Sequence, residues 1–171
     1  TATKSGHEYN YARFGEYFSA AILDPQADLD KDEQTSLLEA FLSASAKVQG
    51  FYVQEARLAT EHALLDDNGD GLGTPADWFR GVRAVRSAKD GALPDGLLAN
   101  QFCLIRSAPE QAMSADVRSK RDALEMEVAR LRGEKPRYTE DEYYGRLEVV
   151  LLDLARLYSQ TEPRPPQNSS H

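Results

Sequence analysis

Two acidic stretches of the chain carry oxygen-bearing side chains at the spacing of a calcium loop. Such a loop takes side-chain oxygens from positions 1, 3, 5 and 12, a backbone carbonyl from position 7, and commonly a water-bridging residue at position 9. The spacing suits a hard cation, which binds six to eight oxygens at about 2.3–2.6 Å. In residues 28–39, called loop 1, these positions hold Asp28, Asp30, Asp32, Glu39, Gln34 and Ser36. We therefore predict a Ca²⁺ site in loop 1.

Loop 1 departs from the pattern at position 6, where glycine normally relieves a sharp turn. Glu33 stands there instead. A residue other than glycine at positive φ costs roughly 1–2 kcal/mol, so we expect weaker binding rather than none. Asp24-Pro25 also interrupts the helix that should lead into the loop.

Residues 66–77, called loop 2, repeat the pattern with the glycine, Gly71, in place. The ligand positions hold Asp66, Asn68, Asp70, the carbonyl of Leu72, and Asp77. An aspartate at position 12 is shorter than a glutamate and predicts weaker, less bidentate coordination. Asp77 also has a competing role, because Thr74 followed by proline predicts a helix N-cap and Asp77 stands where a capping acid belongs.

The alternative interpretation of both loops is a solvated turn, because Asp, Asn and Gly are residues that turns favour. Two matches in one short chain support each other. We therefore expect metal binding with a structural rather than a catalytic role.

The residues that most often do chemistry are scattered. His7 has Ser5 and Glu8 beside it, but members of a catalytic triad meet in space from separate elements. His62 is expected to lie near a helix end, where a cation suits the dipole. Cys103, the one cysteine, is expected to be a buried, inert thiol. No residue of this chain is therefore assigned a catalytic role.

Apolar periodicity predicts two helices in the first half, at 10–23 and 36–65, with the acidic loops at either end of the second. A short helix through Trp78 and Val82 should follow. The alternating run 100–107 predicts one strand, paired with a strand near Val82 or with a sheet outside this chain.

From Ser114 onward, apolar residues recur at intervals of three and four. They predict an antiparallel hairpin of two amphipathic helices with coiled-coil-like seams. Thr139, with Glu142 three residues on, should cap the second helix. The predicted fold class is mainly α with a few short strands. The expected divisions are the segment 1–106 with both acidic loops, the hairpin 107–160 and a disordered, proline-rich tail 161–171.

Composition narrows the class of protein. Of the 171 residues, 41% are hydrophobic and 28% are charged, which is typical of a globular domain. The formal net charge of −8 argues against a nucleic-acid partner, because phosphate contacts need clustered Lys and Arg. No apolar run approaches the roughly 18 residues that a membrane span requires.

The first segment, TATKSGHEYNYARFGEYFSAAI, resembles the part of legumain-like cysteine peptidases that follows the nucleophilic cysteine. In that family a strand ends in Ala-Thr, an acidic loop residue follows, and Tyr-Ala opens the next helix. Ala2-Thr3, Glu8 and Tyr11-Ala12 keep this order. With the acidic loops, which look like those of bacterial proteins of the same group, the resemblance covers roughly residues 1–80.

The resemblance implies a caspase-type α/β fold, of which residues 1–106 would be a remnant. It places the catalytic His and Cys upstream, absent from this chain. It also implies that Ser5, Glu8 and Asn10 line the primary specificity pocket for a peptide or protein substrate. Legumains have serine where this chain has Asn10. This difference argues against a pocket specific for asparagine.

Two hypotheses about function follow. The first is a C-terminal fragment of a legumain-like peptidase or peptidase homologue, inactive alone, with structural calcium loops; the opening TATKSG, which reads as the tail of a strand, favours it. The second is a non-enzymatic calcium-binding module whose hairpin forms an interaction surface, with a homo-oligomer as one outcome. Calcium loops of modest affinity favour an extracytoplasmic setting.

Overall fold

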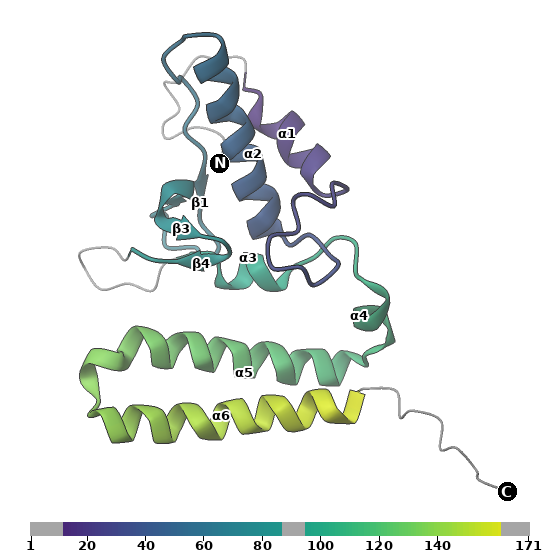
Figure 1. The fold of residues 1–171 in the computed structure, drawn as a ribbon, viewed down its shortest axis with the longest axis vertical. Coiled ribbons are helices and arrows are strands. Elements are labelled where there is room, and N and C mark those ends of the chain that lie inside the picture. Colours follow the sequence, from purple (N-terminus) through teal and green to yellow (C-terminus); the bar gives the residue numbers. More distant parts are fainter. Residues whose placement is uncertain (1–11, 87–94, 162–171) are drawn as a thin grey trace, which may run out of the picture. The chain divides into compact units, whose positions relative to one another are not determined.

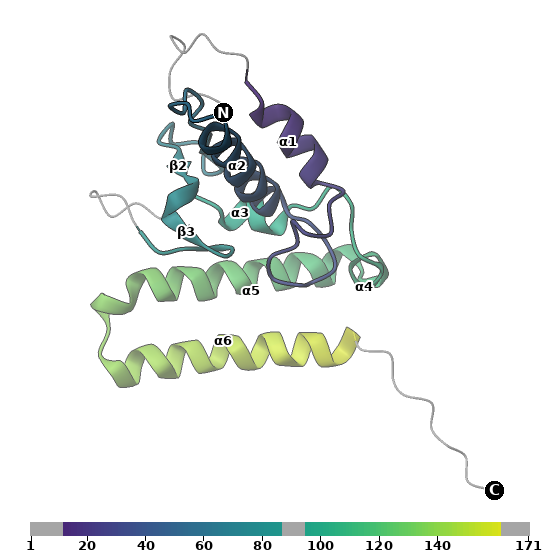
Figure 2. The same ribbon diagram turned by 45° about the horizontal axis from the view of Figure 1, so that its top comes forward.

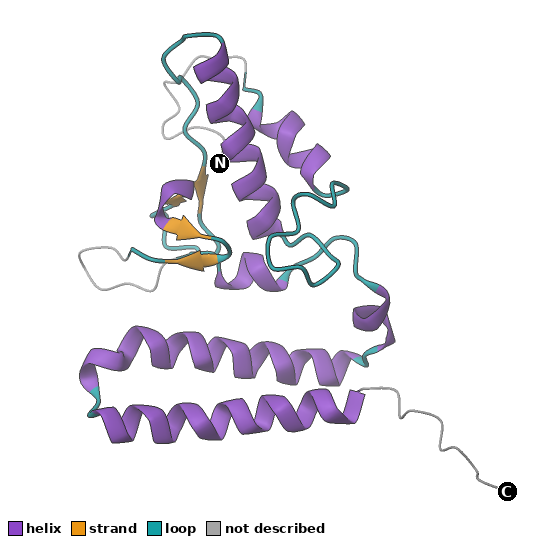
Figure 3. Ribbon diagram, viewed as in Figure 1, coloured by secondary structure: helices purple, strands orange, loops and turns teal. Residues whose placement is uncertain are grey.

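The computed structural model describes residues 12–86 and 95–161 (Figure 1). Within these ranges the chain is mainly α with a few short strands, as the sequence predicts (Figure 3). None of the described helices combines the length and apolarity that crossing a bilayer requires. The chain divides into two compact units, Thr1–Ala108 and Pro109–His171, and each is described by itself.

The first unit is built on two helices that pack against each other, α1 (Phe14–Ala21) and α2 (Leu37–Gln54) (Figure 2). α1 occupies the middle of the predicted helix 10–23, whose first two residues lie outside the described ranges. Phe41 of α2 is buried, and its ring meets the ring of Phe14 edge-on, 5.9 Å between centroids. Burying a side chain of this size contributes roughly 1.5–3 kcal/mol, so this contact anchors the two helices together.

Short elements surround the start of α2. They are β1 (Leu64–Leu65), β2 (Thr74–Pro75), the 3₁₀ turn η1 (Ala76–Trp78), β3 (Phe79–Arg80), β4 (Arg83–Ala84) and α3 (Leu97–Gln101). β1 pairs with β2, and β3 with β4, both antiparallel. Leu38 and Ala99 are buried in one cluster with Phe41, and Leu65 and Phe79 pack against it. A single core thus joins α2, α3 and both strand pairs.

The predicted helix 36–65 is wrong at its C-terminal end. The N–H of Arg57 donates to the carbonyl of Tyr52 at 2.9 Å, and the N–H of Ala56 donates to the carbonyl of Val53 at 3.1 Å. These two bonds form a Schellman motif, with Ala56 in the left-handed region at φ 49°. Periodicity misses this end because the glycine that usually signals such a cap is absent.

The predicted helix cap at Thr74 and the short helix through Trp78 and Val82 are also wrong. Thr74 lies in β2, and its hydroxyl donates to Oδ2 of the buried Asp95 at 2.7 Å, a partner that the local sequence does not reveal. η1 ends at Trp78, and the chain then turns back through Gly81, whose φ of 53° favours a tight hairpin.

The predicted strand 100–107 reduces to one antiparallel bridge, between Cys103 and Ser36. Its first two residues belong to α3 instead. Asp67 Oδ2 accepts the N–H of Gly96 at 2.9 Å and that of Ala99 at 2.8 Å, which supplies this helix with a cap from outside its own segment. The alternation of apolar and polar residues does not predict this remote contact.

The second unit is the predicted antiparallel hairpin. Its elements are α4 (Ala108–Ala112, starting at the boundary), α5 (Ala115–Glu134), the 3₁₀ turn η2 (Lys135–Arg137) and α6 (Glu140–Thr161). Ser114 caps α5, accepting from the N–H of Val117 at 3.3 Å. Both the N–H and the hydroxyl of Thr139 donate to Glu142 Oε2, at 3.0 and 2.9 Å, which confirms the predicted cap of α6. The predicted tail 161–171 begins at Thr161, which is instead the last residue of α6, and the rest of it lies outside the described residues.

The seam of the hairpin is apolar with one charged anchor. Val128, Leu131 and Tyr143 are buried. Arg121 interrupts the apolar face of α5, yet its side chain is only 12% exposed and its Nη2 donates to Glu110 Oε1 at 2.9 Å. A buried arginine paired in this way keeps its charge satisfied, so the interruption does not break the helix pairing.

Candidate metal centres in two acidic loops

Loop 1 gathers the aspartates at its first, third and fifth positions. One carboxylate oxygen from each of Asp28, Asp30 and Asp32 lies within 4.8 Å of the other two. Two oxygens bound to one Ca²⁺ at about 2.3–2.6 Å lie at most about 5 Å apart, so this spacing fits a single ion. In the described part of the chain, no other three His, Cys, Asp or Glu side chains meet the same distance.

Asp28 organises the backbone of loop 1. Its Oδ1 accepts from the N–H of Lys31 at 2.6 Å, and its Oδ2 accepts from the N–H of Glu33 at 3.2 Å. Asp32 then accepts from the N–H of Gln34 at 3.1 Å. These bonds curl the backbone around the aspartates.

Loop 2 repeats these bonds position by position. Asp66 accepts from the N–H groups of Gly69 at 2.9 Å and Gly71 at 3.1 Å, the fourth and sixth residues, as in loop 1. Asp70 accepts from the N–H of Leu72 at 2.7 Å, as the fifth residue of loop 1 does from the seventh. The two loops therefore share one backbone turn although their residues differ at ten of the twelve positions.

The backbone angles agree as well. At the fourth position φ is 65° for Lys31 and 78° for Gly69, and at the sixth it is 69° for Glu33 and 78° for Gly71. Loop 1 thus forces two residues with side chains into the region that glycine occupies freely. The strain expected from the sequence at Glu33 is present in the structure.

Glu39 joins the start of α2 to the aspartate-rich turn. It is 1% exposed, and its Oε2 accepts from the N–H and the hydroxyl of Ser36, each at 2.8 Å, as the acid of a capping box. Its Oε1 accepts from the N–H of Leu29 at 2.7 Å. The carboxylate predicted for position 12 therefore lies beside the loop, although hydrogen bonds of the fold already occupy both of its oxygens.

The carboxylates of loop 1 repel one another. Burial, and then the charges of Asp32, Glu39 and Asp28, raise the pKa of the Asp30 carboxyl from 3.8 to about 6. A divalent cation would offset this repulsion, because an opposite charge favours the ionised form. The residues present fit a hard cation in both their oxygen donors and their charge.

Loop 2 closes differently at its end. The side chain of Asp77 is 69% exposed and pairs with Arg86 at 2.9 Å. Asp77 belongs to no three-carboxylate group in the described ranges, so it is not brought to Asp66 and Asp70. Asn68 accepts from the N–H of Asp70 at 2.8 Å. Loop 2 thus has the backbone turn of loop 1, but the side chain predicted for its twelfth ligand position points elsewhere.

The other predicted ligands of loop 1 are tied to their surroundings. Gln34, predicted to offer its carbonyl, donates its side-chain amide to Asp32 Oδ2 at 2.8 Å and accepts from the N–H of Ser107 at 3.3 Å. Ser36 Oγ lies 3.5 Å from Asn100 Oδ1. These contacts fasten the second half of loop 1 to residues far along the chain.

Two acidic residues that are not among the predicted site residues hold loop 2 in place. Asp67 caps α3 from within the loop. Asp95 is 3% exposed and accepts from the N–H of Asp67 at 3.2 Å and the hydroxyl of Thr74 at 2.7 Å. An aspartate directly before a glycine and two leucines is a helix-start signal, and it could have identified Asp95.

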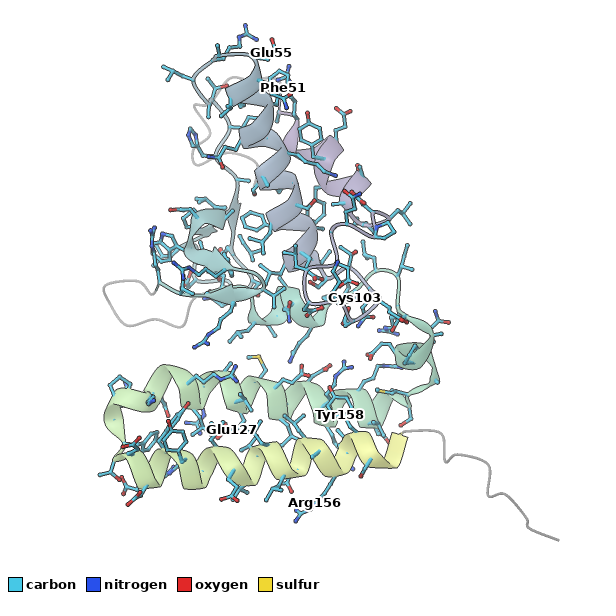
Figure 4. The ribbon with its side chains drawn as sticks, viewed as in Figure 1. Phe51, Glu55, Cys103, Glu127, Arg156 and Tyr158 are labelled. Atoms are coloured by element: carbon cyan, nitrogen blue, oxygen red, sulfur yellow. The ribbon has the colours of Figure 1, made fainter. Side chains whose placement is uncertain are left out.

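Of the three histidines and the cysteine, the structure describes His62 and Cys103. His62 is exposed and lies in an irregular segment rather than at a helix end. Cys103 is half-buried rather than buried. It lies in the segment that follows α3 (Figure 4). The predicted pocket residues, Ser5, Glu8 and Asn10, lie outside the described ranges.

Comparison with known proteins gives no relative. No family model matches the chain, and searches of curated proteins and of solved structures each find no match.

Proposed function

We propose that the chain binds Ca²⁺ in loop 1 and loop 2, and that the ions brace the fold. The observation that carries this proposal is the repeated turn: both loops make the same hydrogen bonds and have positive φ at the same two positions. In loop 1 the turn also brings three carboxylates within the span of one ion. Loop 1 is the stronger site, since Asp77 of loop 2 is directed at Arg86.

A structural role is favoured by what the loops adjoin. Leu38, near the end of loop 1, is fully buried, and Leu65, just before loop 2, packs on the same core. An ion that stabilises either turn would therefore stabilise the core. Binding to the folded state alone raises the free energy of unfolding by about 2.7 kcal/mol when the ligand is at a hundred times Kd.

The test is calorimetric titration of the metal-free protein with CaCl₂. We expect two binding events, of which Asp30→Asn removes the tighter and Asp70→Asn the weaker. Asp153→Asn deletes the same charge from a half-exposed position in α6 and should leave both unchanged. Absence of binding at millimolar Ca²⁺, or equal losses in all three variants, would refute the proposal.

The peptidase hypothesis is a proposal about a longer parent protein. The resemblance of residues 1–80 to legumain-like peptidases supports a parent of caspase-type fold. The catalytic His and Cys of that parent would lie upstream, outside this chain. The calcium loops would then support the pocket lined by Ser5, Glu8 and Asn10. The deciding observation is the coding sequence upstream of Thr1. A His and a Cys codon, each at a predicted strand end, would support the peptidase; a stop codon or a start site would leave a calcium-binding module.

The alternative, a non-enzymatic calcium-binding module, gains support from the hairpin. α6 exposes several large apolar side chains, at Tyr144, Val149, Leu151, Leu152 and Tyr158. Tyr144, Leu151 and Leu152 help to line a shallow hollow of about 400 Å³. We propose a second copy of the chain as the occupant of this face. Light scattering should show a dimer that Leu151→Lys dissociates; a monomer at high concentration would rule it out.

A further inference from the structure

We propose that residues 95–103 form a strut that couples the two acidic loops, so that ordering either loop orders the other. The proposal deepens the proposed function, because it concerns how two calcium loops would influence each other. It begins with α3, whose two ends are held by different loops.

The N-terminal end of the strut is fastened to loop 2. Asp67 accepts the N–H groups of Gly96 and Ala99, at 2.9 and 2.8 Å. In return Asp95 accepts from Asp67 N–H and from the hydroxyl of Thr74. Loop 2 and the start of α3 are therefore linked by four hydrogen bonds, two of them made by a buried carboxylate.

The C-terminal end of the strut is fastened to loop 1. The N–H of Leu37 donates to the carbonyl of Phe102 at 2.9 Å, and Ser36 forms an antiparallel bridge with Cys103. Ser36 is also the N-cap of α2, where its hydroxyl holds Glu39. Displacing the strut would thus disturb the residues that close loop 1.

The middle of the strut has little freedom to absorb a shift. Ala99 is 5% exposed and belongs to the same buried cluster as Leu38 and Phe41. Gly96 has φ 108°, and a Cβ built there would lie 2.7 Å from the ring of Phe79. Close-packed interiors transmit small displacements rather than absorb them, so movement at one end should reach the other.

The experiment uses the full chain without metal and measures amide hydrogen exchange at Leu37. Asp67→Ala removes the cap of α3 at loop 2, and we expect exchange at Leu37, in loop 1, to become roughly fivefold faster, the factor that loss of a typical cap implies. Asp67→Asn retains an acceptor and should restore most of the protection. The N–H of Arg57, at the opposite end of α2, should be unaffected.

Each outcome decides the proposal. Unchanged exchange at Leu37, or equal acceleration at Leu37 and Arg57, would overturn it. If Asp67→Ala does not fold, Thr74→Val is the milder variant, since it deletes only the hydroxyl bonded to Asp95, and the same two amides are compared.

A second arm distinguishes this inference from the proposed function. Loop 1 affinity for Ca²⁺ should fall in Asp67→Ala, although no loop 1 residue is changed. If Ca²⁺ does not bind the wild-type chain, the calcium proposal fails, yet the exchange measurement still decides whether the strut exists. If Ca²⁺ binds loop 1 equally in both proteins, the strut fails and the calcium sites stand.

Discussion

At the residue scale, the sixth position of each loop shows the backbone strain that a side chain causes at positive φ. Glu33 is held at φ 69° in loop 1, and Gly71 at φ 78° in loop 2. Nothing lies within 4 Å of where a Cβ would stand on Gly71, so the difference between the loops is one of backbone strain rather than space.

Glu33→Gly should therefore raise the free energy of unfolding of the first unit by roughly 1 kcal/mol, because glycine enters this region freely. We also expect tighter Ca²⁺ binding in loop 1. Urea unfolding and calorimetry measure the two effects. Glu33→Ala removes the charge and keeps the strain, so a gain of equal size in that variant would contradict the argument.

Ala56 offers the same test at a residue whose own side chain carries no charge. It has φ 49° in the Schellman motif that ends α2. Ala56→Gly should stabilise the protein by about 1 kcal/mol in urea unfolding. Ala46 lies exposed within α2, and Ala46→Gly should instead destabilise by roughly 0.5–1 kcal/mol. Changes of the same sign in the two variants would show that the left-handed conformation is not the cause.

At the element scale, short helices of the first unit depend on carboxylates from distant residues. Glu61 is 4% exposed, and its Oε2 accepts from the N–H of Arg13 at 2.7 Å and of Phe14 at 3.0 Å. Its Oε1 accepts from the hydroxyl of Tyr52 at 3.2 Å. One side chain thus caps α1 and ties it to α2.

Glu61→Ala should cost about 1–3 kcal/mol of unfolding free energy, since it leaves buried donors without their acceptor. Amides of α1 should lose protection from hydrogen exchange before those of α2. Glu55, exposed at the end of α2, supplies the control: Glu55→Ala should change neither measurement appreciably. Uniform loss of protection across both helices would argue against a local cap.

Local caps could be predicted from the sequence and remote ones could not. The cap at Thr139 has its acid three residues away, within the same turn, so spacing alone reveals it. Glu61 lies 47 residues from Phe14, and Asp67 lies 32 residues from Ala99. The turn of the acidic loops was likewise predictable, because it is made by neighbours. The direction of Asp77 was not, because it depends on Arg86, which lies outside loop 2 and follows β4.

The cap of α6 gives a pH dependence. The N–H and hydroxyl of Thr139 lower the pKa of the Glu142 carboxyl below its ordinary 4.5. Because this pKa is lowered in the folded state, the ionised carboxylate stabilises the hairpin above pH 4.5. The stabilisation is lost as the pH falls through the pKa of the folded state. Wild-type protein should therefore lose more helicity than Glu142→Gln on acidification below pH 4.5, by circular dichroism. Parallel curves would contradict this.

At the scale of the whole molecule, the acidic loops belong to the first unit and the hairpin to the second. The hairpin makes its own seam, caps and ion pairs, among them the pair of Arg121 with Glu110. The two units are therefore stabilised by separate sets of contacts. A ligand that binds the acidic loops need stabilise the first unit only.

Calcium should accordingly shift one of two thermal transitions. In scanning calorimetry, adding CaCl₂ after EDTA should raise the midpoint of the first unit and leave that of the hairpin unchanged. Tyr143→Ala, which removes a buried side chain of the hairpin seam, should lower the other midpoint and serves to assign the transitions. A single transition that moves as a whole would show that the units unfold together.

The capping of α1 by Glu61 also has a consequence for synthesis of the chain. A helix of eight residues is too short to persist alone in water. The segment that becomes α1 must then leave the ribosome unfolded and stay so until Glu61, 47 residues behind Phe14, has emerged from the exit tunnel. Folding of the first unit on the ribosome is therefore delayed rather than gradual, and a nascent chain arrested before Glu61 would expose Phe14 and Phe41 to chaperones.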